Sequence, residues 1–235
     1  MSFLLDQNIK VLALDIDGTL YPKWMLNVRM LATSFPSLRL ALSFNKSRKE
    51  YRRIQDQDPP SENTRFGLLE KQASLVCRYM KCPTDAQSVK RMIDRINKQF
   101  YRAWERSFLS IKPYKGMRKA LIQAKESGMR IAVFSDFPLS EKLKTLKIDD
   151  LVDLALSSED SGYLKPSKKA FSFLLAHLEE DPQQVLYVGD SYDKDCQGAK
   201  NAGMYACLLT EGRKAGYSDA DLVVGSWKEF SSLVL

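Results

Sequence analysis

The stretch Lys10-Val-Leu-Ala-Leu-Asp-Ile-Asp-Gly-Thr19 places a short apolar run directly before two aspartates. The run Lys10–Leu14 has the length and composition of a buried β-strand, and Asp15 and Asp17 follow where that strand ends. Other apolar runs of strand length occur later in the chain, at Arg130–Phe134, Leu154–Leu156, Val185–Val188 and Tyr205–Leu209. Together these runs predict the strands of one sheet.

Helical stretches separate the predicted strands. Gly128 and Gly203 predict helix ends, and Pro166 predicts the first turn of a helix. Alternation of strands and helices is typical of the α/β class, with a Rossmann-like parallel sheet core flanked by helices. In such a sheet, ligands bind beyond the carboxyl ends of the strands.

Polar residues follow four of the predicted strands. They are Asp15-Ile16-Asp17-Gly18-Thr19, Ser135-Asp136, Gly162-Tyr163-Leu164-Lys165-Pro166, and Gly189-Asp190-Ser191 with Asp195 shortly after. Carboxylates gathered at one edge raise one another's pKa unless a cation is present. Oxygen-rich sites of this kind suit Mg²⁺, which shares carboxylates with a substrate phosphate, and lysine supplies a compact positive charge for phosphate oxygens.

The segment 22–110 differs from the rest of the chain in charge and in pattern. It holds 18 basic and 8 acidic residues, a net charge of +10, whereas the remaining residues sum to −3. Apolar residues recur in it at three- and four-residue steps, as in Phe66, Leu69, Ala73, Val76 and Met80, and again in Val89, Met92, Ile93, Ile96, Phe100, Trp104 and Phe108. This spacing predicts amphipathic helices, the second beginning at a Thr84–Gln87 capping box.

Composition excludes several classes of protein. The chain has 235 residues, 44% of them hydrophobic, and no apolar run approaches the length that spans a bilayer. A single histidine, His177, excludes paired-histidine metal sites, and we expect it at a helix C-terminus. The cysteines form no CxxC pair, and Met1–Leu14 resembles a lead-in to a strand rather than a secretion signal. We therefore predict a cytoplasmic protein with no membrane partner.

At the four strand-end motifs, the sequence resembles the haloacid dehalogenase superfamily, in its phosphatase branch. The resemblance covers all four family motifs, in order, across residues 10–204. It implies a Mg²⁺-dependent reaction in which Asp15 is the nucleophile and Asp17 the general acid and base. The dehalogenating members lack this second aspartate, so its presence favours phosphatase chemistry.

The resemblance also assigns roles to the other motif residues. Ser135, Asp136 and Lys165 form the phosphate-binding set. The family more often has asparagine at the position of Asp136, and we expect the Asp136 side chain to be solvated. The Asp15 carboxylate, the Asp17 backbone carbonyl and Asp190 hold the metal. Residues expected to support the site are Gly18, Thr19, Ser191 and Asp195, the last by orienting Lys165 or a metal-bound water.

The resemblance further implies that residues 22–110 form a helical cap inserted after the first motif. The α/β core then comprises residues 1–21 and 111–235, with hinges near Pro22 and Pro113. The cap's basic residues Arg48, Lys49, Arg52 and Arg53 either steer anionic substrates or, as we favour for most of them, form a solvated helix face. Aromatic residues interleave with them, but Phe100, Tyr101 and Trp104 are expected to face the core, which argues against nucleic-acid binding.

The expected function is hydrolysis of a small phosphorylated metabolite, such as phosphoglycolate, a sugar phosphate or a nucleoside monophosphate. A phosphomutase of the same family is the alternative within the same chemistry. A non-catalytic protein that uses the basic cap for RNA or a partner is the alternative outside it. The sequence makes no prediction of the oligomeric state.

Overall fold

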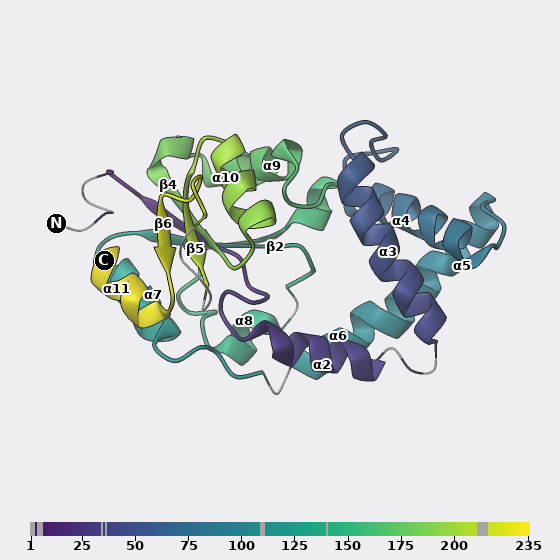
Figure 1. Cartoon of the computed structure of the whole chain (residues 1–235), viewed down its shortest axis with the longest axis horizontal. Coiled ribbons are helices and arrows are strands. Elements are labelled where there is room, and N and C mark those ends of the chain that lie inside the picture. Colours follow the sequence, from purple (N-terminus) through teal and green to yellow (C-terminus); the bar gives the residue numbers. More distant parts are fainter. Residues whose placement is uncertain are drawn as a thin grey trace.

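A six-stranded parallel sheet lies at the centre of one part of the molecule, and a group of helices lies to one side of it (Figure 1). The strand order is β3-β2-β1-β4-β5-β6. The computed structural model describes residues 3, 7–33, 35, 37–108, 111–139, 141–210 and 216–235. The expected α/β class with a Rossmann-like parallel sheet is confirmed.

The strands are close to those predicted from the sequence. Their bounds are β1 Val11–Leu14, β2 Arg130–Ser135, β3 Leu154–Ser157, β4 Val185–Gly189, β5 Tyr205–Leu209 and β6 Leu222–Val224. Every predicted strand is present, but β6 was not predicted, because a run of three apolar residues is too short to stand out from a loop. The start of the N-terminal segment that was expected to lead into β1 lies outside the described residues.

Helices cover both faces of the sheet. Their bounds are α7 Met117–Glu126, α8 Lys142–Leu146, α9 Lys168–Leu178, α10 Gln197–Asn201 and α11 Trp227–Leu233. Leu12 and Leu14 of β1 point into a buried cluster with α7, α8 and α11, whereas Val11 and Ala13 face a second cluster with α9 and α10. Alternate side chains of one strand therefore enter different cores, as expected for a sheet buried on both sides.

The register of the sheet aligns the ends of its central strands. Leu14 of β1 lies opposite Val133 of β2 and Val188 of β4. The backbone N–H of Asp15 donates to the Val188 carbonyl at 2.9 Å, so the chain leaves the sheet directly after this bond. The motifs that follow β1, β2 and β4 consequently emerge at one edge of the sheet.

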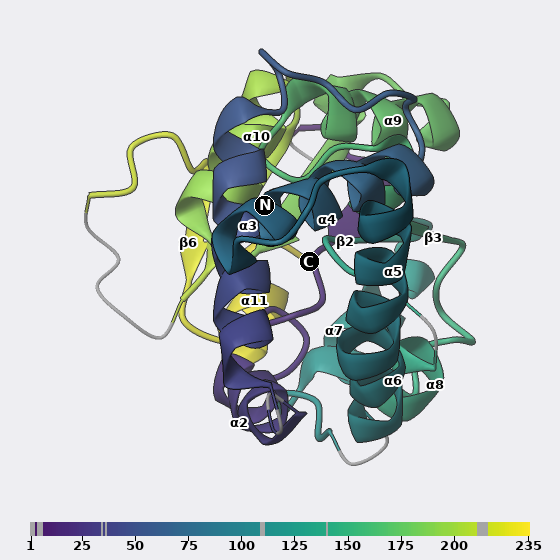
Figure 2. The same ribbon diagram turned by 90° about the vertical axis from the view of Figure 1, so that its right-hand side faces the viewer.

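The helices between β1 and β2 form the insertion expected from the sequence. Their bounds are α2 Lys23–Thr33, α3 Leu38–Ile54, α4 Arg65–Met80, α5 Ala86–Ile96 and α6 Arg102–Ser107, with a π-helical turn at Asn97–Tyr101. Helix α4 contacts both α3 and α5 (Figure 2). An all-helical cap is confirmed, while its borders at residues 22 and 110 remain a prediction, and residues 109 and 110 lie outside the described part.

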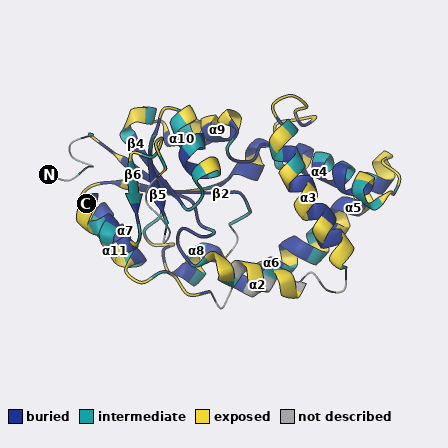
Figure 3. Cartoon of the chain, viewed as in Figure 1, coloured by how far each residue is buried: buried dark blue, intermediate teal, exposed yellow. Residues whose placement is uncertain are grey.

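Aromatic side chains fill the interior of this cap. The Phe44 and Phe100 rings stack with centroids 5.1 Å apart, and Phe100 stacks in turn on Trp104 at 5.5 Å. Phe100, Tyr101 and Trp104 are buried, as predicted. Figure 3 shows buried and exposed residues alternating along the cap helices α3, α4 and α5. Tyr101 and Trp104 also contact the Phe137 ring of the core, so these aromatic side chains pack both within the cap and against the core.

Two predicted helix starts are wrong by one or two residues. Helix α5 is capped by Asp85, whose carboxylate accepts from both the backbone N–H and the hydroxyl of Ser88, and Thr84 does not cap it. Helix α9 is capped by Ser167, so Pro166 precedes the helix instead of forming its first turn. In both cases a side chain nearer to the helix supplies the oxygen that the free N–H groups need.

The residues used to exclude other classes are placed as follows. All four cysteines are free thiols. His177 lies in the last turn of α9, as predicted, with its Nδ1 atom 2.8 Å from the Phe173 carbonyl. Among the described residues, none of the helices combines the length and the apolar character that crossing a membrane requires.

Candidate active site

Asp15 lies at the end of β1 with its carboxylate buried at the edge of the sheet. The Lys165 ammonium donates to Asp15 Oδ1 at 2.7 Å, and the Thr19 hydroxyl donates to Oδ2 at 3.2 Å. Burial raises the pKa of Asp15 to about 7; Lys165 opposes this rise, and the charges of Asp195, Asp190 and Asp17 add to it. The site thus holds a carboxyl group that a further cation would ionise fully.

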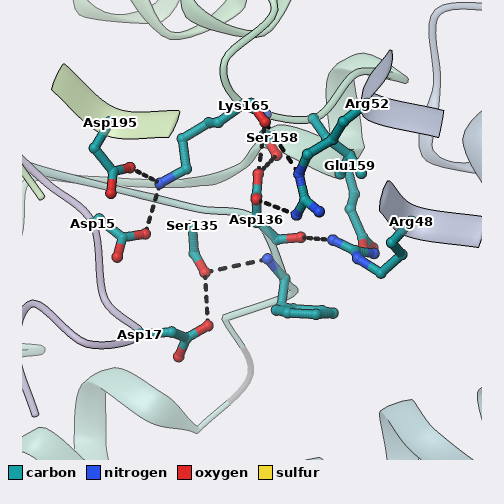
Figure 4. Close-up of polar contacts among 12 residues, drawn as sticks. Asp15, Asp17, Arg48, Arg52, Ser135, Asp136, Ser158, Glu159, Lys165 and Asp195 are labelled. Atoms are coloured by element: carbon teal, nitrogen blue, oxygen red, sulfur yellow. Dashed lines mark hydrogen bonds and ion pairs between the residues drawn. The ribbon is translucent and has the colours of Figure 1, made fainter. Parts of the chain in front are cut away.

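Lys165 connects the motifs that follow β3 and β4 (Figure 4). Its ammonium, 1% exposed, contacts Asp15 and Asp195 at 2.7 Å each and the Tyr187 hydroxyl at 3.0 Å. Burial alone lowers the pKa of this lysine, but the carboxylates of Asp15 and Asp195 outweigh it, and the pKa is raised. Lys165 therefore carries a fixed positive charge beside Asp15, and Asp195 holds it there.

Asp17 occupies a separate environment from Asp15. The Lys142 ammonium donates to both of its carboxylate oxygens, at 2.9 and 3.0 Å, and the Tyr21 hydroxyl donates to Oδ1 at 2.5 Å. Ser135 Oγ lies 3.5 Å from Asp17 Oδ2 and accepts from the Phe137 backbone N–H at 3.2 Å. Lys142 was not predicted as a site residue, since nothing in the sequence near α8 indicates which carboxylate it meets.

Asp190 completes an acidic group with Asp15 and Asp195. One oxygen from each lies within 4.8 Å of the other two, a spacing that a metal ion could bridge. Asp190 Oδ1 is buried and has no hydrogen-bond partner among the residues that the structure describes. An unsatisfied carboxylate oxygen among oxygen donors fits a hard divalent cation. The metal ligands predicted from the sequence were Asp15, Asp190 and the backbone carbonyl of Asp17. The acidic group in the structure contains Asp195 in place of that carbonyl.

Two glycines allow these carboxylates to approach the backbone. Gly18 has φ +111°, and a Cβ atom there would lie 2.4 Å from Asp190 Oδ2. A Cβ on Gly189 would lie 2.3 Å from the Cβ of Asp195. Ser191 donates its backbone N–H to Asp195 Oδ2 at 3.0 Å, which fixes the Asp195 carboxylate against the same turn.

Lys23, at the start of α2, is a second cation that the sequence did not predict at the site. Its ammonium lies 2.6 Å from Asp190 Oδ2, with the lysine side chain 46% exposed. Burial lowers the pKa of Lys23, but the Asp190 charge and hydrogen bond outweigh it and the pKa is raised. The first helix of the cap thus supplies a positive charge to the acidic group.

Asp136 differs most from its expected environment, because it is buried and not solvated. Its Oδ2 accepts from Arg52 at 2.7 Å, and its Oδ1 accepts from the Ser158 hydroxyl and the Lys165 backbone N–H at 2.8 and 3.1 Å. Burial opposes ionisation of Asp136, but the charges of Arg52 and Lys165 outweigh it and lower its pKa. Asp136 is therefore a buried anion that ties the cap to the turn carrying Lys165.

The predicted solvated face of the cap is wrong for two of its four basic residues. Arg48 is 4% exposed and pairs with Glu159 at 2.6 Å, and its Nη2 also donates to the Asp136 carbonyl at 2.8 Å. Arg52 pairs with Asp136, whereas Lys49 is exposed and Arg53 is exposed beside Glu50. Helix α3 is amphipathic in charge, with two arginines turned to the core and two basic residues to solvent.

A cavity of about 280 Å³ lies between the core and the cap at this site. Asp15, Asp17 and Asp136 line it from the core, and Lys23, Arg48 and Arg52 line it from the cap. A cavity of this size accommodates a small metabolite beside the carboxylates of Asp15 and Asp17, which line its wall.

These motifs can now be compared with those of known proteins. The family model for haloacid dehalogenase-like hydrolases matches residues 9–203, which include every motif described above. The chain belongs to this family. The expected family is thereby confirmed.

Several curated relatives with similar sequences are named phosphatases. A glyceraldehyde 3-phosphate phosphatase of Pyrococcus abyssi is 35% identical over 109 residues, covering 45% of this chain and 46% of the relative. A glyceraldehyde 3-phosphate phosphatase of Methanopyrus kandleri is 28% identical over 213 residues, covering 87% of this chain and 85% of the relative. The match thus spans about half the length of the Pyrococcus protein and most of the Methanopyrus protein.

Solved haloacid dehalogenase structures share the fold. The 2-haloacid dehalogenase of Pseudomonas syringae has a TM-score of 0.64 at 19% identity, over 95% of this chain and 97% of that one. The likeness includes the helical cap as well as the sheet, because it covers nearly the whole of both chains. At this identity it concerns the fold alone.

Proposed function

We propose that this haloacid dehalogenase-like hydrolase is a Mg²⁺-dependent phosphatase of small phosphorylated metabolites, of the sugar-phosphate class. One observation carries the proposal: two carboxylates on the same turn are held in different environments. Asp15 is paired with Lys165 beside the acidic group, and Asp17 is paired with Lys142 and Tyr21. Such a division suits a nucleophile and an acid–base group that act on one substrate.

In the first half-reaction, a carboxylate oxygen of Asp15 attacks the phosphorus of the ester. The bond between Asp15 and phosphorus forms as the ester P–O bond breaks, and the leaving oxygen takes a proton from Asp17. Lys165 stabilises the charge on the attacking carboxylate and on the phosphoryl oxygens. Ser135 binds a phosphoryl oxygen in this proposal, which its hydroxyl contacts with the Asp17 side chain and the Phe137 N–H support.

In the second half-reaction, the Asp17 carboxylate takes a proton from water, and the water oxygen attacks phosphorus. The bond between Asp15 and phosphorus breaks, which restores the Asp15 carboxylate and releases phosphate. Lys142 and Tyr21 contact the Asp17 carboxylate from the protein side, so they hold it in one orientation through both steps.

The metal is assigned to Asp15 and Asp190, with Asp195 adjacent and the Asp17 backbone carbonyl as a further oxygen ligand. When bound, Mg²⁺ supplies positive charge that neutralises the phosphoryl oxygens. The unpartnered Oδ1 atom of Asp190 supports this assignment.

Dehalogenation is the activity named for several of the structural neighbours, but Asp17 argues against it here. A dehalogenase of this family attacks carbon and lacks the second aspartate, whereas this chain holds Asp17 with two donors. The names of the curated relatives support phosphate-ester hydrolysis as well.

The experiment is a panel of phosphate esters with Mg²⁺, including glyceraldehyde 3-phosphate, assayed for phosphate release with the wild type and Asp15→Asn. The expected result is turnover that the substitution reduces by at least about 10³-fold, because the covalent route is lost. Phosphate release unchanged in Asp15→Asn would contradict the nucleophile. Isomerised sugar phosphate in place of free phosphate would favour the phosphomutase.

A further inference from the structure

The charges that line the active-site cavity do not balance. Each carboxylate on its wall is paired with a cation: Asp15 shares Lys165 with Asp195, Asp17 has Lys142 and Asp136 has Arg52. Two lysines on the wall, Lys49 of α3 and Lys194 of the turn Tyr192–Cys196, have no counterion or hydrogen-bond acceptor among the residues that the structure describes. The cavity wall therefore presents two ammonium groups that make no ion pair.

The other cations of the cavity wall are already committed. Lys23 pairs with Asp190, and Arg48 pairs with Glu159. Arg52 uses Nε for the Lys165 carbonyl and Nη2 for Asp136, which leaves the N–H groups of Nη1 without a partner among the described residues. Arg52 is 22% exposed, so these groups remain available to a ligand.

The Arg52 guanidinium lies away from the nucleophile. In Figure 4, Arg52 and Arg48 lie beyond Asp136 as seen from Asp15. Lys194 lines the same cavity from the turn that follows β4. Lys49 and Arg52 lie three residues apart on α3 and both line the cavity, Arg52 from the core-facing side of the helix and Lys49 from its exposed side.

We propose that Lys49, Lys194 and Arg52 bind a second anionic group of the substrate, a carboxylate or a second phosphate on the part that leaves. The inference rests on the proposed phosphatase function and narrows its substrate class. A phosphoryl group beside Lys165 and the acidic group places the rest of a small ester in the cavity, where these donors line the wall. Hydrogen bonds between charged partners are stronger than neutral ones, so a second anion gains affinity that a hydroxyl does not.

The test compares 3-phosphoglycerate with glycerol 3-phosphate, which are similar in size and differ in the carboxylate. We expect kcat/KM to be at least about tenfold higher for 3-phosphoglycerate. In Lys49→Gln and Lys194→Gln this ratio falls toward one, and it falls furthest in the double variant. Lys46→Gln, on the same helix but over the Tyr79 ring outside the cavity, serves as the control and keeps the wild-type ratio.

Simple electrostatic steering gives a different result. If the lysines only attract anions from solution, the wild-type preference for the more highly charged 3-phosphoglycerate disappears at high ionic strength, which overturns the proposal. A wild-type ratio near one overturns it as well.

Calorimetric binding of the same two esters to Asp15→Asn with Mg²⁺ separates this inference from the proposed function. Tighter binding of 3-phosphoglycerate, lost in the lysine variants, supports the second-anion site even if neither ester is turned over. Equal binding of the two esters rejects it, whatever the outcome of the nucleophile test.

Discussion

The Lys23 ammonium lies 2.6 Å from Asp190 Oδ2, so the first residue of the cap's first helix contacts a carboxylate of the candidate metal group. The contact joins residues 167 positions apart in the chain. A divalent cation at the acidic group competes with this ammonium for the same carboxylate. The charge at the start of the cap is therefore coupled electrostatically to the acidic group of Asp15, Asp190 and Asp195.

Replacing Lys23 by glutamine is expected to strengthen Mg²⁺ binding about two- to fivefold. The reason is that a partly exposed ion pair contributes roughly 0.2–1 kcal/mol, which the metal no longer has to overcome. Calorimetric titration with Mg²⁺ measures the change, with Lys46→Gln as the matched cap lysine. Weaker Mg²⁺ binding in Lys23→Gln would show that the ammonium does not compete with the metal.

Mg²⁺ affinity is expected to rise about tenfold between pH 6 and pH 8. With a pKa of about 7, Asp15 is ionised in roughly a tenth of molecules at pH 6 and in roughly nine tenths at pH 8. Only the ionised form binds the cation, so binding releases a proton in this window. Titrations in Asp15→Asn serve as the control, since the dependence on pH disappears there.

The same pKa sets the sign of a stability change in the metal-free protein. Folded Asp15 keeps its proton up to about pH 7, whereas an unfolded aspartate loses it near pH 4. The folded state therefore binds more protons between these values, and Asp15 makes the free energy of unfolding fall as pH rises through them. Urea unfolding of wild type and Asp15→Asn at pH 5 and pH 8, without metal, isolates this contribution. A wild-type Mg²⁺ affinity that is constant from pH 6 to pH 8 would contradict both expectations.

Lys142→Met is expected to lower kcat by about 100-fold while KM changes little. Lys142 is a positioning residue, because its ammonium contacts both oxygens of Asp17 and orients the proposed acid–base group. Steady-state kinetics measures the split between kcat and KM, and Lys142→Arg is expected to restore part of kcat. Lys144→Gln, on the same helix with an exposed partner in Glu141, is the control. An equal loss in both variants, or a loss in KM alone, would exclude the positioning role.

Glu159→Ala is expected to lower the free energy of unfolding by about 3–5 kcal/mol. Glu159 is fully buried, and its removal leaves Arg48 buried without its counterion. Urea denaturation measures the change, and the double variant Arg48→Met/Glu159→Leu loses less because no charge remains unpaired. Glu50→Ala, which removes an exposed pair with Arg53, is expected to leave stability unchanged. A similar result for Glu159→Ala and Glu50→Ala would show that the buried pair does not stabilise the docked cap.

The motif residues were predictable because their positions follow from local patterns. An apolar run ending in Asp15 predicts both a strand and the place where it ends, and parallel pairing brings that end beside the end of β4. The three- and four-residue periodicity likewise predicted the cap helices and the burial of Phe100 and Trp104. The roles of the motif residues in catalysis remain predictions.

The partners of the charged groups were not predictable in the same way. Asp136 was expected in solvent, yet Arg52 and Ser158 enclose it, because the docked cap and the turn after β3 cover this edge. Lys142 meets Asp17 across 125 positions of chain, and no spacing in the sequence encodes that contact. Helix α3 gives another example. Its basic residues are alike in sequence, and only the docking of the cap determines which of them face the core.

The places of the first five strands along the chain, the inserted helices and the oxygen-rich strand ends are thus properties of the chain itself, since they depend on periodicity and on residues adjacent in sequence. Only the folded molecule decided which cation neutralises which carboxylate and which lysines remain without a partner. The ion pairs form where the cap packs on the core. Burial at that boundary makes an unpaired charge costly, so the way the cap docks determines which charged side chains pair.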